Sequence, residues 1–122
     1  MFNSGTIYSN FTPLVKAPVI GYRISGDDVL KILKKITKKN FSKDHSLIRI
    51  VKIYQKDESI LDECSVVYFK SPKSFTGEDV CEIFLHGSPL IASQFEQLLK
   101  DLKVPGLRSV SYTHLRAHET RE

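Results

Sequence analysis

The sequence predicts an α+β (mixed α/β) domain in which two main helices pack on a sheet of about five strands. Short runs of β-branched and aromatic residues recur between turn signals, which is typical of strands. Two longer segments instead carry apolar residues at helical spacing. With 122 residues, of which 41% are hydrophobic and 26% charged, the chain fits one domain with a modest core.

Two strands and the start of a helix are predicted first along the chain. Residues 6–11 and 19–24 have the composition of strands. Arg23 falls on the less apolar face of the second strand, where it is either a surface residue paired with a carboxylate or part of a site. Ser25 and Asp28 form a capping-box pattern, which predicts that the helix is capped by Ser25.

The first predicted helix has an apolar stripe and a lysine face. The stripe contains Val29, Leu33 and Ile36, at the spacing of one helical face. The other face and the C-terminal turn carry Lys31, Lys34, Lys35, Lys38 and Lys39. Such a face is usually solvated surface, and contact with RNA is the functional alternative. The net charge of +4 suits an RNA-associated protein but does not identify one.

A hairpin and a second helix are predicted in the second half. Residues 46–54 are apolar on both faces, which predicts a mostly covered strand. A connection at residues 55–59 leads to a returning strand at 60–70. Further on, Ser88 can cap a helix that has Pro89 at its first position and an apolar stripe as far as residue 102.

The strand predicted at residues 80–86 carries the most unusual residue of the sequence. Cys81, Ile83 and Leu85 form one apolar face, which is expected to meet the core. Glu82 lies among apolar residues on the other face. A carboxylate in such a position either reaches water or needs hydrogen-bond donors, because an unpaired buried charge is costly. Glu82 is therefore a solvated side chain or the acceptor for a ligand with paired N–H donors.

Several classes of protein are not predicted. No apolar run approaches the length of a membrane span, and the N-terminus lacks the parts of a secretion signal, so we expect an intracellular protein. Cys64 and Cys81 lack zinc-type spacing and are expected to be reduced and buried. His114 and His118 have no cysteine nearby in the sequence, and no metal site is predicted.

Four segments carry a resemblance to a known family. In chain order, TIY, YRISG, SPKSFTGEDVCEIFLHGSP and VPGLR resemble the N-terminal domain of the tRNA-modification GTPases called MnmE or TrmE, mitochondrial relatives included. The resemblance covers residues 6–108, and SFTGEDVCEIFLHG is its most specific piece. It implies a folate-binding module related to the glycine-cleavage T-protein, which also forms the homodimer. The sequence is therefore divided into this domain, residues 1–108, and a tail.

The resemblance also implies an activity for the full-length protein. That protein adds a helical domain and a G domain that uses GTP, magnesium and potassium. With an FAD-dependent partner protein it modifies the wobble uridine of tRNA, using a one-carbon unit carried by formyl- or methylene-tetrahydrofolate. The location would be the bacterial cytoplasm or the mitochondrial matrix. No P-loop, GxxxxGK[ST], occurs in this sequence, so GTP hydrolysis by this chain alone is not expected.

Carried over by position, the resemblance implies that Arg23, in YRISG, and Glu82, in GEDVCE, contact reduced folate. A carboxylate can accept two parallel hydrogen bonds from the amino-pyrimidine edge of a pterin. An arginine supplies fixed donors for a carbonyl or an anionic tail. The family's third contact is a lysine beyond a PGEF segment, which has no counterpart here. The alternatives are a structural dimerisation module without folate and an RNA-contacting module.

The last segment of the chain differs from the rest. Residues 109–122, SVSYTHLRAHETRE, have no apolar period and resemble adapter-derived read-through more than the family's sequence. We expect this segment to be a non-native tail, disordered or weakly docked, because it offers little apolar surface to offset its ordering entropy.

Overall fold

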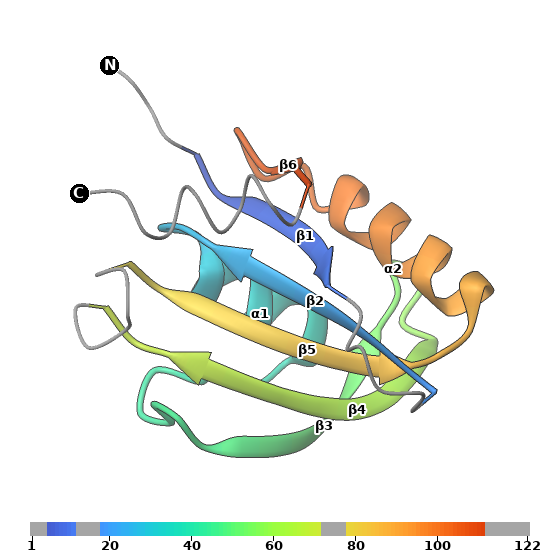
Figure 1. Cartoon of the computed structure of the whole chain (residues 1–122), viewed down its shortest axis with the longest axis horizontal. Coiled ribbons are helices and arrows are strands. Elements are labelled where there is room, and N and C mark those ends of the chain that lie inside the picture. The colour runs from blue at the N-terminus through green and yellow to red at the C-terminus, as the bar shows by residue number, and fades with distance from the viewer. Residues whose placement is uncertain (1–4, 12–17, 72–77, 112–122) are drawn as a thin grey trace.

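The sheet has six strands and is antiparallel except at one edge. The computed structural model describes residues 5–11, 18–71 and 78–111. In spatial order, the strands are β3 (Ile48–Tyr54), β4 (Ile60–Phe69), β5 (Val80–His86), β2 (Val19–Ser25), β1 (Ile7–Phe11) and β6 (Arg108–Ser109). The β1–β6 pair is parallel and the other four pairs are antiparallel (Figure 1).

Both helices pack on the same face of this sheet. Figure 1 views the sheet from its open face, with α1 (Val29–Thr37) behind it. The second helix is α2 (Pro89–Asp101). Apolar side chains of both helices share one buried cluster with Cys81, Ile83 and Leu85 of β5, which are fully buried. The prediction of an α+β fold with two helices on a sheet is confirmed, and so is the buried face of β5.

The predicted cap of the first helix is wrong. Ser25 is the last residue of β2, and its hydroxyl donates to Glu78 Oε1 at 2.7 Å. Helix α1 begins at Val29, and Asp28 occupies the N-cap position without a side-chain cap bond. Asp28 is held instead by Thr6, whose Oγ1 donates to Asp28 Oδ2 at 3.1 Å and accepts from the Asp28 N–H at 3.0 Å.

The length of β2 explains this difference. Ser25 pairs with Ile7 on β1 and with Val80 on β5, so the sheet keeps it extended. Gly26 then turns the chain with a φ of 143°, which side chains rarely adopt. A Cβ at Gly26 would lie 2.6 Å from Thr6 Oγ1, so only glycine fits this turn. The ladder hydrogen bonds therefore outweigh the local capping pattern.

The second helix follows its prediction. The Ser88 hydroxyl accepts a hydrogen bond from the Ile91 N–H at 3.4 Å, and Pro89 occupies the first helical position. Phe95, Leu98 and Leu99 form its buried side. The cap works here because β5 ends at His86, two residues before Ser88, so Ser88 is free of ladder pairing.

Strand β3 is not covered as predicted. It is the outer strand of the sheet, and its open face carries Ile48 and Ile50 with 73% and 66% of their surface exposed. Only the opposite face, with Val51 and Ile53, is buried. The apolar residues on both faces of this strand were correctly recognised, but their burial on both faces was not.

A sixth strand, β6, extends the sheet beyond the strands predicted from the sequence. The Arg108 N–H donates to the Thr6 carbonyl at 3.2 Å, and the Val110 N–H donates to the Tyr8 carbonyl at 2.9 Å. Pairing with β1 thus continues past residue 108, where the sequence placed the domain boundary. That boundary stays a prediction. Residues 112–122 of the predicted tail lie outside the described residues.

Two further expectations can be compared with the described residues. Cys64 and Cys81 are free and buried, as predicted. No helix among residues 5–11, 18–71 and 78–111 is long and apolar enough to cross a membrane.

Candidate functional site on the open face of the sheet

Arg23 and Glu82 lie directly opposite each other on neighbouring strands. They are register partners of the β2–β5 pair, although 59 positions separate them in the sequence. Arg23 donates from Nε to Glu82 Oε2 at 3.0 Å, and its Nη2 donates to the same oxygen. The two side chains keep 23% and 15% of their surface exposed. The sequence left open whether Glu82 reaches water or finds donors, and Arg23 supplies those donors.

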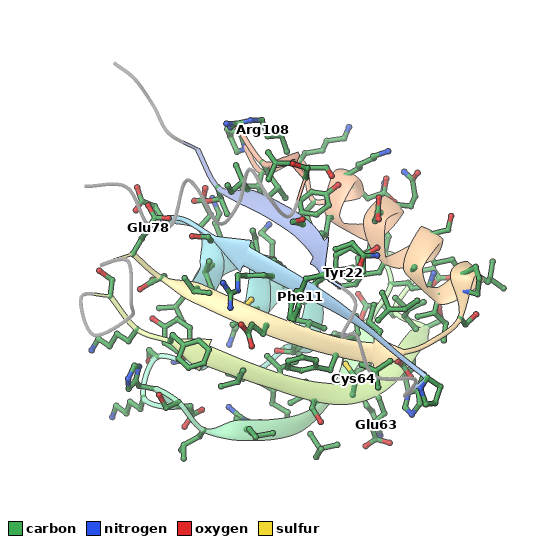
Figure 2. The ribbon with its side chains drawn as sticks, viewed as in Figure 1. Phe11, Tyr22, Glu63, Cys64, Glu78 and Arg108 are labelled. Atoms are coloured by element: carbon green, nitrogen blue, oxygen red, sulfur yellow. The ribbon has the colours of Figure 1, made fainter. Side chains whose placement is uncertain are left out.

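Two aromatic rings stand beside this ion pair. The Phe11 ring centroid lies 5.7 Å from the Arg23 guanidinium carbon, which is a cation–π distance. Phe11, which is labelled in Figure 2, meets Phe84 edge to face, with 5.8 Å between ring centroids. The charged pair therefore lies on an apolar and aromatic surface, where water screens it less than at an exposed site.

A hollow on the open face begins at Glu82 and extends toward β3. It has a volume of about 510 Å³ and is walled mainly by apolar side chains of four strands. Its lining residues are Val19, Ser46, Ile48, Ser65, Val66, Val67, Phe69, Glu82 and Phe84. This volume lies within the usual range of small-molecule sites, roughly 300–1,000 Å³. A mostly apolar hollow with one carboxylate at its edge suits a flat, largely apolar ligand that carries hydrogen-bond donors.

A second hollow of about 400 Å³ continues from the first toward the end of β5. The two share Val19, Ser65 and Phe84. At its far end the His86 ring nitrogen Nδ1 lies 2.8 Å from Asp62 Oδ1, and Asp62 Oδ2 accepts from the His86 N–H at 2.9 Å. Both carboxylate oxygens of Asp62 thus contact His86 and hold the C-terminal end of β5.

The buried thiols beside these hollows do not suit nucleophilic chemistry. Burial raises the pKa of Cys64 to about 12, and the nearby Asp62 and Glu63 carboxylates add to the shift. Burial also raises the pKa of Cys81. Since the thiolate is the reactive form, both groups are inert near neutral pH. Among residues 5–11, 18–71 and 78–111, no three histidine, cysteine or acidic side chains form a metal site.

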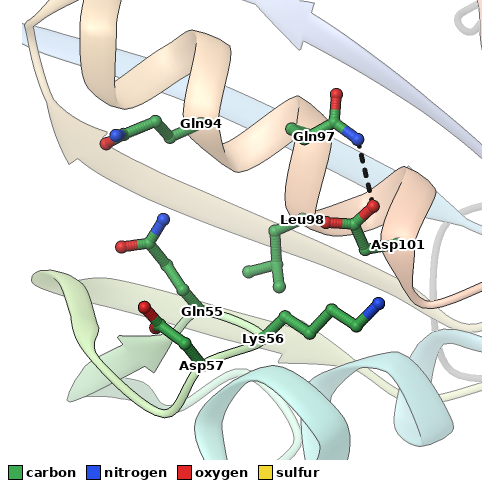
Figure 3. A pocket seen from close by; sticks show the side chains of 7 residues that line it. All are labelled: Gln55, Lys56, Asp57, Gln94, Gln97, Leu98 and Asp101. Carbon is green, nitrogen blue, oxygen red and sulfur yellow. Dashed lines mark hydrogen bonds between the residues drawn. The ribbon is translucent and has the colours of Figure 1, made fainter.

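A third cleft lies on the other side of the molecule, between the β3–β4 hairpin and α2 (Figure 3). Its volume is about 260 Å³ and its walls are mostly polar: Gln55, Lys56, Asp57, Gln94, Gln97, Leu98 and Asp101. Within it Gln97 Nε2 donates to Asp101 Oδ1 at 3.0 Å. None of the residues that the sequence marked as a site lies here, so the open face remains the candidate site.

The comparisons with known proteins agree with the sequence motifs. The sequence model of the family described as "GTP-binding protein TrmE N-terminus" matches residues 6–113. The chain belongs to this family. It is also similar to "tRNA modification GTPase MnmE" of Helicobacter pylori (strain HPAG1), at 44% identity over 98 residues. The protein of the same name from Rickettsia bellii (strain OSU 85-389) is 38% identical over 103 residues.

The match covers most of this chain but a small part of those relatives. It includes 80% of this chain and 21% of the Helicobacter protein, and 84% and 23% for the Rickettsia protein. The chain therefore spans about a fifth of the length of these TrmE relatives. What the relatives do as whole proteins comes to this chain only as a proposal.

Sequence reasoning singled out the two charged residues of the candidate site and missed most residues that line the hollow beside Glu82. Phe11 and Ile48 were assigned to strands, but nothing local to them indicates that they border the same face as Glu82. Their position depends on the strand order β3-β4-β5-β2-β1. The available signal was the pair of apolar residues Ile48 and Ile50 on one face of the strand, which becomes informative only once β3 is known to be an edge strand.

Proposed function

We propose that this chain is the folate-binding and dimerisation domain of a tRNA-modification GTPase. The supporting observation is that Arg23 and Glu82, the two residues that the family resemblance implies as folate contacts, pair with each other, and that Glu82 lines a hollow. They come from strands that are distant in sequence, so their meeting is a property of the fold. A structural pair that served only stability would need no hollow beside it.

The donors and acceptors present fit a reduced folate, formyl- or methylene-tetrahydrofolate. Arg23 donates two hydrogen bonds to Oε2 of Glu82, and no hydrogen bond from the described residues reaches Oε1. Oε1 can therefore accept from a pterin N–H while the ion pair persists. Engaging both oxygens with the amino-pyrimidine edge would require Arg23 to turn away, and the anionic tail of the folate is a suitable new partner for it. Phe84 and Val67 supply apolar contact for the ring system.

In this proposal the chain binds and orients the folate, and the folate supplies the one-carbon unit. The half-buried Glu82 distinguishes a pterin, which presents N–H groups, from a phosphate, which the carboxylate repels. GTP, magnesium and potassium would act in a G domain, and the FAD-dependent partner and the wobble uridine of tRNA would meet the assembled protein. The relatives named above are bacterial, which favours the bacterial cytoplasm as the location.

The test is a calorimetric titration that measures the affinity for 5-formyltetrahydrofolate. It is carried out on this chain and on a full-length relative. Glu82→Gln keeps the size of the side chain but turns one acceptor into a donor that faces the pterin N–H groups. Affinity should fall by on the order of 1–3 kcal/mol, roughly five-fold to 150-fold, with the fold unchanged by circular dichroism. Glu63→Gln, an exposed change at the neighbouring hollow, should leave affinity unchanged. Equal binding by the Glu82→Gln variant, or no binding by either wild-type protein, contradicts the folate site.

The second candidate function is a dimerisation module that does not bind folate. Ile48 and Ile50 favour a role in association, because two large apolar side chains more than half exposed on an edge strand are a surface that another chain can cover. We infer that the other chain is a second copy. Replacing both by lysine should shift the sedimentation coefficient from dimer to monomer, whereas Glu82→Gln should leave the dimer intact. A chain that is monomeric at all concentrations would exclude association through this face.

A further inference from the structure

The basic charge of this protein is concentrated in one short segment. The whole chain has 18 basic and 14 acidic residues, a net charge of +4. Residues 29–39, which are α1 and the turn that follows, contain five lysines and no acidic residue. The other 111 residues therefore hold 13 basic and 14 acidic residues, a net charge of −1. The protein is close to neutral apart from this segment, which is strongly positive.

The five lysines form a continuous exposed face. Lys31, Lys34, Lys35, Lys38 and Lys39 are all exposed, while the opposite side of α1 is buried in the core. The first four recur at i, i+3, i+4 and i+7, so they follow one stripe along the helix and its C-terminal turn. We call these five residues the lysine face.

Most of the lysine face has no counter-charge among the residues that the structure describes. Lys38 pairs with Glu58 of the β3–β4 hairpin and lies over the Tyr54 ring, with its Nζ 4.4 Å from the centroid. No ion pair within the described residues involves Lys31, Lys34, Lys35 or Lys39. The nearest acidic residues of the helix are Asp27 and Asp28, at its N-terminal end, and Asp28 is engaged with Thr6.

Repulsion among these lysines lowers stability slightly, and a bound polyanion would remove that repulsion. Lys31 has like charges three and four residues later, and pairs at these spacings destabilise a helix. One or two lysines in the last turn are enough to complement the helix dipole, and Lys34 and Lys35 already occupy that turn. The remaining positive charges are explained by a partner with regularly spaced negative charges.

We propose that the lysine face binds the phosphate backbone of RNA, which in a tRNA-modifying protein is tRNA. A phosphate backbone offers many negative charges at a regular spacing, and exposed lysines bind it as mobile point charges without reading sequence. The inference rests on the family's role in tRNA modification but not on folate binding. The lysine face lies on the helix-covered side of the sheet, and Arg23 and Glu82 lie on the open side (Figure 1). The two sites can therefore fail independently.

The experiment compares two variants with the same net charge. In the first, Lys31, Lys34 and Lys35 are changed to Gln. In the matched control, three exposed lysines outside the lysine face are changed to Gln: Lys52, Lys70 and Lys100. Both changes lower the formal charge by three. Binding of fluorescently labelled unmodified tRNA to this chain and to a full-length relative with the corresponding changes is measured by anisotropy at several salt concentrations.

The lysine-face variant should bind tRNA at least ten-fold more weakly and show a smaller dependence of log Kd on log salt, by on the order of two. The control should stay within about three-fold of wild type, since it loses only general attraction. Changing Lys31, Lys34 and Lys35 to Arg should retain binding, because charge is kept. Titration with 5-formyltetrahydrofolate should be unaffected by all three variants, so loss of tRNA binding is separable from loss of the folate site.

Three results would overturn the proposal. Equal losses in both Gln variants would show that only net charge matters. Unchanged binding by the lysine-face variant would place the RNA contact elsewhere. Failure of both wild-type proteins to bind tRNA at low salt would leave the lysine face to a different polyanion, of which an acidic protein surface is the first to consider.

Discussion

Arg23 and Glu82 each pair with a residue on another strand, so the sequence around either one does not reveal its partner. From the strand pattern alone both were recognisable as charges on apolar strands, and each had a structural and a functional explanation. In the structure the two residues pair with each other, and Glu82 also lines the hollow on the open face. A partner for a charge on a strand can be read from sequence only if the register of the neighbouring strand is known.

The ion pair should contribute to stability even without ligand. Arg23→Met removes the donors and leaves a carboxylate with 15% exposure among apolar residues. The free energy of unfolding should fall by about 1–2 kcal/mol, less than for a fully buried pair, because Glu82 can still reach water through the hollow. Urea denaturation measures this. Glu58→Gln, at the exposed Lys38 pair, is the control and should change stability by less than about 0.5 kcal/mol.

A double variant distinguishes pairing from packing at this site. If the cost of Arg23→Met comes from the unpaired carboxylate, adding Glu82→Leu should restore part of the lost stability. If stability falls further instead, the aliphatic part of Arg23 against Phe11 would account for the effect.

The two predicted helix caps show where element-level reasoning succeeds and fails. Ser25 and Ser88 both precede helical patterns, and only Ser88 becomes a cap. The difference lies in long-range pairing, because β2 has a neighbour on each side and extends to Ser25 in order to complete both ladders. A capping pattern therefore predicts the helix start correctly where the preceding strand ends before the capping residue, as at Ser88. It fails where strand pairing continues through that residue, as at Ser25.

Replacing Ser88 by Ala tests the cap that does form. The Ile91 N–H loses its acceptor, and such losses typically cost about 1 kcal/mol. The melting temperature should fall by several degrees, which differential scanning calorimetry resolves. Ser93→Ala, an exposed change inside α2, should be neutral or slightly stabilising because alanine is the better helix former. An equal fall in both variants would show that the cap bond is not the cause.

For the whole molecule, the sequence predicted the fold class, both helices and five of the six strands. Periodicity and turn residues are local properties, so they were sufficient for these elements. Strand order depends on contacts between distant segments. Neither the edge position of β3 nor the β1–β6 pair could therefore be derived from local sequence patterns. The candidate site was likewise predictable only in part. Its charged residues were visible as anomalies of single strands, whereas the hollow exists only because β2, β3, β4 and β5 present their open faces together.

The core contains several protonated groups whose ionisation opposes folding, so the molecule should lose stability at alkaline pH. Burial raises the pKa of Tyr68 to about 12, with the Asp79 carboxylate adding to the shift, and Cys64 also has a pKa of about 12. Burial, together with the hydrogen bond to Glu96, raises the pKa of Tyr22 as well. In the unfolded chain, tyrosine and cysteine ionise near their ordinary pKa values, about 10 and 8.5.

The sign and size of this effect follow from proton linkage. Below pH 8.5 both states keep these protons, and stability does not depend on the groups. As pH rises from about 8.5 for Cys64, and from about 10 for Tyr68, the unfolded state releases protons that the folded state retains, and this continues up to about pH 12. Each such group lowers the free energy of unfolding by about 1.4 kcal/mol per pH unit. Urea midpoints measured from pH 7 to 11 should therefore be flat at first and then fall steeply above pH 10. Tyr68→Phe should make that fall shallower by the contribution of one proton, and a midpoint that stays constant to pH 11 would show that these groups ionise freely in the folded protein.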